Sequence, residues 1–408
     1  MGIRTDKPVR NQLIFLTLLL MLTGLFLSRA LLSLSMVAFV LLTLVHRRYR
    51  EQFMHFFSSP VLISMCLLFF IPFITGLWSE DKGEWAHWCR IKLPLLLFPL
   101  AFAGPWRLDP KQWRLLAIAF LFFVFAGCCW SLAQYLSNLE AIAEGYLRAK
   151  VFPTPLGNDH VRFSLLVCLA FLTTTLLFIK TRVRYLRLAC IAAGIFFAVY
   201  LHVLSARTGL LSLYFFLVAG ALYLLWRVRT KWTVVVCLLL AAMPLAAWTL
   251  LPTFRNRIRY IVYDFSYIRK DIYLPGANDG NRMLSLKAGW SVMNEHRLGA
   301  GAGDVLAETN AWYSRHIPQM LETDKIYPSS EWLMYGAGAG WPGFLLFTLC
   351  MLLPFFEKMR SGWFFWASLN TISALSFLFD IGLETQFGVF VYAFTVLAWK
   401  KKYGLRDL

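Results

Sequence analysis

The sequence predicts an all-α, polytopic membrane protein with about twelve transmembrane helices and one large extramembrane loop that contains short helices. Three observations predict this fold class. Of the 408 residues, 59% are hydrophobic. These residues gather in blocks of about twenty, the length that a helix needs to cross a bilayer. The Lys and Arg residues concentrate in alternate connections between the blocks, as expected when successive spans cross in opposite directions.

The twelve predicted spans follow from long apolar runs, of which the fourth is the shortest. They are residues 12–28, 30–45, 59–78, 91–103, 115–136, 163–179, 188–205, 209–226, 232–252, 331–355, 362–380 and 385–399. The first is not read as a cleavable signal peptide, because "LFLSRALLSL" offers no small-residue cleavage site and further spans follow at once.

The charge distribution predicts the orientation of the chain. Both ends of the chain and the alternate connections together hold 22 Lys and Arg but only five Asp and Glu, whereas the opposite face holds 18 against 17. Nearly all of the net charge of +18 therefore lies on one face, which we expect to be cytoplasmic. Both termini are then cytoplasmic, in agreement with an even number of spans.

The same distribution argues against a nucleic-acid channel, because the outer face is close to neutral. Anionic membrane lipid explains the basic inner face without another ligand. Seven of the eight cysteines lie within predicted spans, where cysteine packs as a small apolar residue. The sequence contains no C-x-x-C or H-x-x-x-H spacing, so we expect no metal site and no cofactor.

Counting from a cytoplasmic N-terminus places three segments on the far side of the membrane: 79–90, 137–162 and 253–330. The last is much longer than an ordinary connection, and loops of that length are generally functional. The predicted organisation is nine spans over 1–252, the large loop over 253–330, and three spans with a cytoplasmic tail over 331–408.

The large loop is expected to begin at the membrane surface and continue into a helix. Residues 253–273 interleave cations with aromatic and aliphatic side chains, a pattern typical of a segment in the headgroup plane or of a juxtamembrane anchor. Residues 281–296 repeat apolar side chains every three or four positions, which predicts a helix capped by Asp279 or Asn281, with Arg282 in its first turn. The glycines of "RLGAGAGD" end that helix and can let the backbone approach a ligand.

Two arginines are candidates for binding an anion. Arg207 stands in "HVLSARTGLL", where hydrophobic stretches arrive from both sides. A charge is costly there, so Arg207 either serves a functional site or extends its guanidinium to the lipid headgroups. Arg282 is expected at a helix N-terminus, where free N–H groups, the positive end of the helix dipole and a guanidinium converge.

Three blocks occur in a recognisable order: "SARTG" at 205–209, "GNRMLSLKAGWSVMNEHRLGAGAGD" at 280–304 and "PSSEWLMYGAGAGWPG" at 328–343. Together they resemble the O-antigen ligase and polymerase family of bacterial envelope glycosyltransferases. That family has S-R-x-G at the mouth of a span, an R-x-x-x-W-x-x-A-like helix followed by H-x-L-x-G-x-G, and a P-H-N-x-x-L segment that enters a span. The resemblance implies a metal-independent, inverting enzyme of the bacterial inner membrane, with its active site on the periplasmic face and the large loop periplasmic.

The resemblance also implies roles for single residues. Arg207 and Arg282 match the family arginines that are thought to bind the diphosphate of an undecaprenyl-linked sugar. Ser329 stands at the position of the histidine in P-H-N and is followed by Ser330 and Glu331. The role of that histidine in activating or orienting the acceptor therefore does not carry over, and both serines are only expected to contact substrate.

Glycan transfer also needs a base for the acceptor hydroxyl. Glu331, at the mouth of a span, is the candidate; the alternative is a first-turn glutamate that only favours the helix dipole. His160 and Arg162 in "PLGNDHVRFSLL" stand at another span entrance, as in the H-x-R-F-S of some family members, and are expected to bind substrate. His296 and His316 in the large loop are further candidates, with ordinary solvated histidines as the alternative.

The expected donor is an undecaprenyl-diphosphate-linked glycan, and the expected acceptor is lipid A core, another glycan or a protein. A polymerase of the same fold, which joins lipid-linked repeat units, is the first alternative to a ligase. A transporter of lipid-linked oligosaccharide is a second. It predicts charged or broken helices near the middle of the membrane, whereas the spans 115–136 and 232–252 contain no charged residue.

Overall fold

The computed structural model describes residues 7–148, 150–270 and 272–404, and the regular secondary structure of these ranges is entirely helical. A helix overlaps each of the twelve predicted spans: α1 (Lys7–Leu27), α2 (Arg29–Leu44), α4 (Pro60–Thr75), α5 (Lys82–Ala103), α6 (Pro110–Ser137), α9 (His160–Lys180), α10 (Arg184–Leu204), α11 (Arg207–Trp226), α12 (Thr230–Leu250), α16 (Glu331–Leu352), α17 (Trp363–Phe379) and α18 (Gln386–Tyr403). The all-α prediction is confirmed.

The connections contain further, mostly shorter helices. They are α3 (Tyr49–Phe57), α7 (Leu139–Gly145), α8 (Pro155–Asn158), α13 (Pro252–Ile268), α14 (Asn278–Glu295), α15 (Val305–His316) and the 3₁₀ turns η1 (Tyr146–Arg148), η2 (Glu322–Asp324), η3 (Leu353–Phe356) and η4 (Gly382–Glu384).

Seven of the described helices are long and apolar enough to cross a membrane: α1, α6, α9, α10, α11, α12 and α16 with η3. The pair α2 and α3, bent by 112°, would be an eighth span. The other predicted spans have physical reasons for falling short. α4 and α17 have only 16 and 17 residues. α5 carries several charged side chains in its first half, and α18 carries three lysines in its last turn. The structure therefore supports seven to eight spans.

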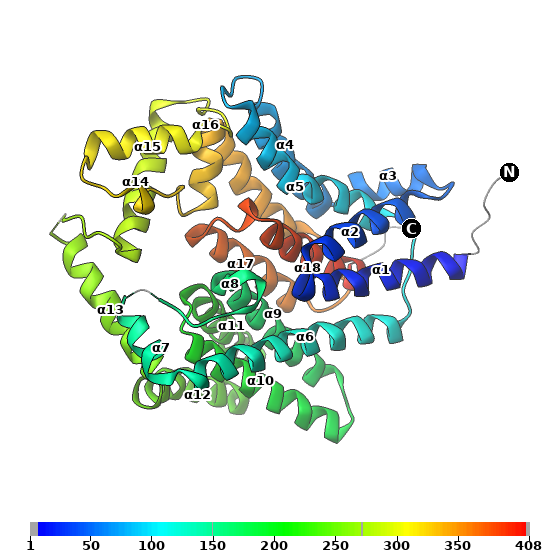
Figure 1. Cartoon of the computed structure of the whole chain (residues 1–408). Helices are drawn as coiled ribbons and strands as arrows, with labels where there is room; N and C mark the ends of the chain where they lie inside the picture. Colours follow the sequence, from blue (N-terminus) through cyan, green and yellow to red (C-terminus); the bar gives the residue numbers. More distant parts are fainter. Residues whose placement is uncertain (1–6, 149, 271, 405–408) are drawn as a thin grey trace.

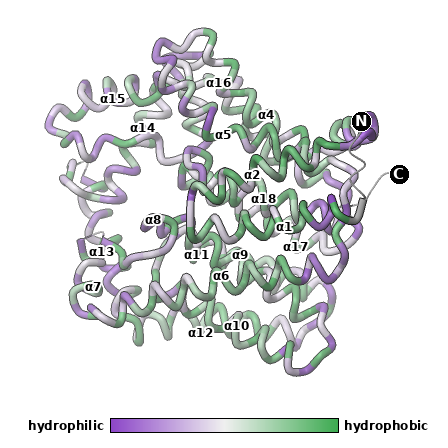
Figure 2. The backbone as a smooth tube through the Cα atoms, turned by 45° about the vertical axis from the view of Figure 1, so that its right-hand side comes forward, coloured by the Kyte–Doolittle hydropathy of each residue, from purple (hydrophilic) through white to green (hydrophobic). Residues whose placement is uncertain are grey.

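The helices form an apolar layer between two polar ends. Hydrophilic segments gather at the two ends of the molecule, and the hydrophobic segments lie between them (Figure 2). α13, α14 and α15 lie at the end opposite the first and last described residues (Figure 1). The helices α13, α14 and α15 and the first and last described residues are thus on opposite sides of the apolar layer (Figure 1).

α5 begins earlier than the predicted span at residue 91, because Asp81 caps it. The Asp81 side chain accepts a hydrogen bond from the N–H of Glu84 at 2.8 Å, which satisfies one of the free N–H groups at the start of the helix. The segment 79–90, expected to be an outer connection, is therefore mostly helix. Polar residues are tolerated in this part of α5 because it extends beyond the apolar run.

The large loop packs on the transmembrane helices. Asp304, just before α15, accepts hydrogen bonds from the Ser79 hydroxyl (2.7 Å) and from the N–H groups of Glu80 (2.8 Å) and Asp81 (2.9 Å). A small apolar cluster joins α14, α15 and α16; it contains Val292, Val305, Met334 and Ala337. These contacts fix α14 relative to the membrane helices.

The glycines of "RLGAGAGD" approach protein backbone. The N–H groups of Ala300 and Gly301 donate to the carbonyls of Ala337 and Gly338 at 2.9 and 3.0 Å. Gly299 has φ +86°, and a Cβ on it would overlap the Gly338 carbonyl. The close approach that these glycines permit is therefore to α16, in place of the ligand expected from the sequence.

α16 is itself broken at Gly340, which has φ +65°. Next to the break, the N–H of Trp341 donates to the carbonyl of Arg297 at 3.2 Å. The break in α16 is thus bound to the loop after α14.

Candidate anion-binding site

Arg207 begins α11 because the chain reverses at Ser205. Ser205 follows α10 in the left-handed conformation with φ 51°, and its hydroxyl donates to the carbonyl of His202 at 2.6 Å. Ala206 is extended and precedes the first residue of α11. The Arg207 guanidinium therefore lies at the mouth of a membrane helix, and 34% of the side chain is exposed.

The first turn of α14 is held by α13. The Asp264 carboxylate accepts hydrogen bonds from the N–H groups of Asp279 (2.7 Å) and Gly280 (3.2 Å). The Tyr260 hydroxyl accepts from the N–H of Asn278 at 2.9 Å. These N–H groups have no partner within their own helix, so α13 supplies the cap. Burial raises the pKa of Asp264 above its ordinary value.

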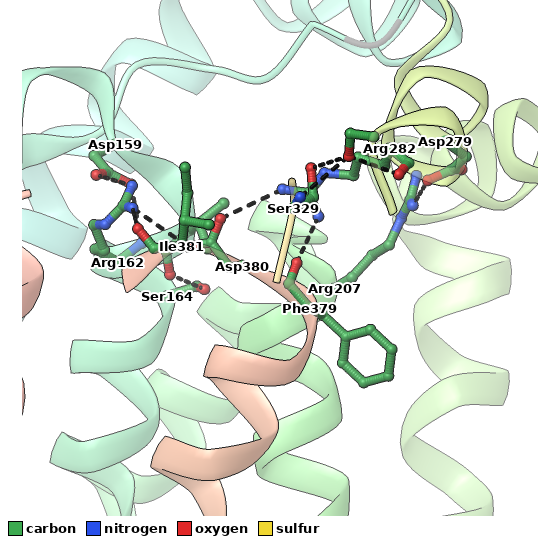
Figure 3. A network of polar contacts seen from close by, with 12 residues as sticks. Asp159, Arg162, Ser164, Arg207, Asp279, Arg282, Ser329, Phe379, Asp380 and Ile381 are labelled. Carbon is green, nitrogen blue, oxygen red and sulfur yellow. Dashed lines mark hydrogen bonds and ion pairs between the residues drawn. The ribbon is translucent and has the colours of Figure 1, made fainter. Parts of the chain in front are cut away.

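This arrangement corrects the capping that the sequence predicts. The residue before α14 is Ala277, so neither Asp279 nor Asn281 caps the helix. Asp279 lies in the first turn, and its carboxylate forms an ion pair with Nη1 of Arg207. Arg282 follows three residues later, a spacing that makes neighbours on a helix surface. The two arginines therefore meet at one turn of α14 (Figure 3).

Asp380, directly after α17, links Arg282 to Arg162. Its Oδ1 lies 3.6 Å from Nη2 of Arg282, and its Oδ2 lies 3.5 Å from Nη2 of Arg162. Arg162 also pairs with Asp159 at 2.7 Å. The network Asp159–Arg162–Asp380–Arg282 thus joins the starts of α9 and α14 to the end of α17 (Figure 3).

Both of these arginines also bind the last carbonyls around α17. Nη1 of Arg282 donates to the carbonyl of Phe379 at 3.2 Å, and Nη2 of Arg162 donates to that of Ile381 at 2.7 Å. A helix C-terminus carries partial negative charge, so guanidinium groups are stable there. Arg162 is only 14% exposed, whereas Arg282 is 31% exposed. Arg282 is therefore the more accessible of the two guanidinium groups.

Arg207 keeps unused hydrogen-bonding capacity. Its Nε and Nη2 are buried and have no hydrogen-bond partner among the described residues. Unpaired buried donors cost free energy, and an anion would satisfy them. Arg207 and Arg282 can therefore neutralise an anion that binds between α11 and α14.

The structure places Glu331 in a different cluster. It is completely buried at the start of α16, and one carboxylate oxygen accepts a hydrogen bond from the N–H of Leu383. Nearby, Lys92 forms an ion pair with Glu384, and the Lys92 ammonium lies 4.8 Å from the centre of the Tyr335 ring. No contact between Glu331 and Arg207 or Arg282 occurs in the described part of the chain.

Ser329 and Ser330 are also buried, at the N-terminus of α16. The Ser329 hydroxyl lies 3.0 Å from the Ser285 hydroxyl, and its N–H donates to the same oxygen at 3.1 Å. Ser330 is the residue before α16, and its N–H donates to the carbonyl of Pro328 at 2.8 Å. The position of the family histidine thus joins α14 to α16.

The three candidate histidines occupy different places. His160 is half-buried at the start of α9, where the charges of Arg257, Arg282 and Asp159 act on it. His296 lies 3.5 Å from Glu308 and is 40% exposed. Nδ1 of His316 lies 2.9 Å from the carbonyl oxygen of Trp312, which can only accept a hydrogen bond, and the imidazole stacks on the Trp312 ring. The structure therefore groups His160 alone with the arginines.

Sequence reasoning did not assign a site role to Asp264, Arg257 or Asp380. The sequence contained a signal for Arg257 and Asp264. Together with Tyr260 they stand at positions i, i+3 and i+7 of α13, a spacing that places them on one helix face, and all three are buried. Asp380 directly follows α17, the helix over the predicted span 362–380. Within the described ranges, no group of three or more His, Cys, Asp or Glu is arranged to hold a metal ion.

Comparison with known proteins identifies a family domain in part of the chain. Residues 198–348 match the family model described as O-Antigen ligase, and no curated protein matches the chain. The matched region contains Arg207, Arg282 and the serine pair at 329–330. It begins in α10 and ends in α16, and so includes the whole loop between them. The resemblance seen in the sequence is confirmed, because residues 198–348 match the O-antigen ligase domain, and this match supports a membrane glycosyltransferase of the O-antigen ligase or polymerase type.

Proposed function

We propose that this protein transfers a glycan from an undecaprenyl-diphosphate carrier to an acceptor at the periplasmic face of the bacterial inner membrane. The observation that carries the proposal is the meeting of Arg207 and Arg282 at the first turn of α14. The two residues are far apart in sequence, and Arg207 has two donors with no partner among the described residues. Two guanidinium groups suit the two phosphoryl groups of a diphosphate.

The arginines stabilise the leaving group. The acceptor oxygen forms a bond to the anomeric carbon while the bond from that carbon to the diphosphate oxygen breaks. The diphosphate leaves with the bonding electron pair, and its negative charge increases in the transition state. Arg207 and Arg282 compensate that charge, as fixed positive groups do in other enzymes. Attack from the side opposite the leaving group inverts the anomeric centre.

We assign to His160, in preference to Glu331, the role of the base that removes the proton of the acceptor hydroxyl. His160 is half-buried and lies within the electrostatic range of Arg282, whereas Glu331 is completely buried. A base must reach the proton that it removes, directly or through one water. Glu331 instead positions the segment around Leu383, which follows Asp380. It acts as a positioning residue for the carboxylate that holds Arg282.

The test uses purified full-length protein, a synthetic undecaprenyl-diphosphate-linked glycan with a labelled sugar, and lipid A core as acceptor. Arg282→Gln should lower the transfer rate by about 10²-fold or more, the usual effect of removing one group that stabilises transition-state charge. Arg297→Gln is the matched control, because Arg297 is an exposed arginine that follows the same helix. Equal rates for these two variants would refute the proposal.

The same assay separates the ligase from the polymerase. Label on lipid A core supports a ligase. Label on a lengthened lipid-linked glycan when no other acceptor is present supports a polymerase. His160→Gln should lower kcat with little change in the donor KM, and an unchanged kcat would exclude His160 as the base.

A further inference from the structure

Arg257 on α13 is a buried cation with unused donors. Its side chain is only 5% exposed, and its Nε and Nη1 have no hydrogen-bond partner among the described residues. Burying a charged group without a partner is unfavourable. A ligand that accepts hydrogen bonds from these two donors would offset this cost.

The first turns of α13 are fixed by neighbouring residues. The Thr253 hydroxyl donates to the carbonyl of Val203 near the end of α10 at 2.7 Å. The Asn256 amide donates to the carbonyl of Ala143 in α7 at 2.8 Å. Arg257 follows directly, so its backbone is held between α10 and α7.

Arg257 lies on the face of α13 that holds the first turn of α14. It shares one buried face of α13 with Tyr260 and Asp264, and those two residues bind the N–H groups at the start of α14. Both oxygens of Asp264 are engaged there, at the N–H groups of residues 279 and 280. The first turn of α14 is also the one that pairs with Arg207. Arg257 is therefore one turn of α13 away from the candidate site.

The charges around Arg257 are consistent with a place in that site. Burial lowers the pKa of Arg257, and the positive charge of Arg282 lowers it further, while Tyr146, Tyr260 and Asp264 act in the opposite direction. Arg257 also acts on His160, as Arg282 does. The positive charges of Arg207, Arg257 and Arg282 thus repel one another near the first turn of α14. A multivalent anion bound there would relieve this repulsion.

We propose that Arg257 is a third arginine of the anion site, and that its Nε and Nη1 donate to the diphosphate of the lipid-linked donor. The inference rests on the proposed function. It adds Arg257, a residue that lies outside the sequence motifs from which that function was inferred. A third guanidinium matches a ligand that carries two to three negative charges better than one that carries a single charge.

The experiment measures the Kd of inorganic pyrophosphate for the purified full-length protein in nanodiscs, together with the unfolding midpoint. Arg257→Gln should raise that Kd about tenfold or more, the effect of losing a charge-assisted hydrogen bond. Arg257→Lys should recover part of the affinity because it keeps the charge. Arg259→Gln is the matched control, since Arg259 is exposed on the same helix, and its Kd should change less than about twofold.

The unfolding midpoint distinguishes binding from support of the fold. Arg257 lies 6.0 Å from the centre of the Tyr260 ring, but its Nε and Nη1 have no hydrogen-bond partner among the described residues. Removing a buried cation of this kind should leave the midpoint unchanged or raise it. A lower midpoint for Arg257→Gln, with no recovery by Arg257→Lys, would assign Arg257 to the fold and overturn the inference. So would equal Kd values for Arg257→Gln and Arg259→Gln.

An Arg282→Gln variant in the same titration separates the two proposals. If Arg282→Gln weakens pyrophosphate binding and Arg257→Gln does not, the third-arginine inference fails and the proposed function stands. If both weaken binding but the unchanged protein transfers no glycan, the proposed function fails and the anion site stands. If the unchanged protein does not bind pyrophosphate, both fail.

Discussion

Replacement of Arg207 should affect stability and glycan transfer by separate routes, because its ion-pair partner is buried. Asp279 is 8% exposed and Arg207 is 34% exposed, so Arg207→Gln leaves a mostly buried carboxylate without its cation. Breaking a fully buried pair costs about 3–5 kcal/mol, and an exposed pair contributes at most about 1 kcal/mol. Because Arg207 is partly solvated, we expect a loss of about 2 kcal/mol in the free energy of unfolding.

A double variant separates the two effects. Arg207→Gln with Asp279→Asn removes the unpaired carboxylate, so most of the lost stability should return. Transfer should not return, since the double variant still lacks a guanidinium for the leaving group, and the rate should stay about 10²-fold or more below that of the unchanged protein. Asp279→Asn alone frees Arg207 and should retain transfer.

The measurements are unfolding in detergent, transfer from the labelled lipid-linked donor, and surface polysaccharide in cells. Arg207→Ala should abolish the surface polysaccharide while the protein remains in the membrane. Recovery of transfer in the double variant would show that Arg207 acts only by holding Asp279, and would refute the role in charge compensation. An unchanged free energy of unfolding in Arg207→Gln would refute the value given to the ion pair.

Three further outcomes test other parts of the structure. Glu331→Gln keeps an acceptor for the N–H of Leu383, so the transfer rate should stay within about threefold of that of the unchanged protein. A fall in the transfer rate of about 10²-fold at unchanged stability would show that Glu331 is a catalytic group. Gly299→Ala should lower the free energy of unfolding by more than about 2 kcal/mol, because Gly299 has φ +86° and a Cβ there would overlap α16. Gly276→Ala should lower it by only about 1 kcal/mol, because Gly276 has φ +70° but open space around it. Thermal unfolding measures both losses, and equal losses would contradict this explanation. Asp304→Ala removes three accepted hydrogen bonds and should speed proteolysis of the loop before α15, and an unchanged cleavage rate would show that these bonds do not anchor it.

The placement of Glu331 illustrates how packing changes the interpretation of a motif. At the mouth of a predicted span, an acidic residue near two arginines is a reasonable base. In the structure, the same residue is completely buried and bound to the N–H of Leu383 from η4. The site around Arg282 is instead bounded by Asp380, which lies two residues before that turn. Distance in sequence did not predict which carboxylate reaches the arginine.

The sequence by itself determined the properties that depend on local composition. The apolar blocks predicted a helix at each of the twelve spans, and "SARTG" predicted an arginine at the start of one of them. The spacing of apolar residues predicted the helix after residue 280, which the structure has as α14 (Asn278–Glu295). Hydrophobicity and helical periodicity act over a few turns, so they can be read from neighbouring residues.

Only the tertiary structure decided which polar groups meet. The pairing of Arg207 with Asp279, the contact of Arg282 with Asp380 and the burial of Arg257 each join elements that are distant along the chain. The same holds for the cap of α14, which comes from α13. Ion pairs and desolvation depend on distance in space and on what excludes water, and packing of the helices sets both.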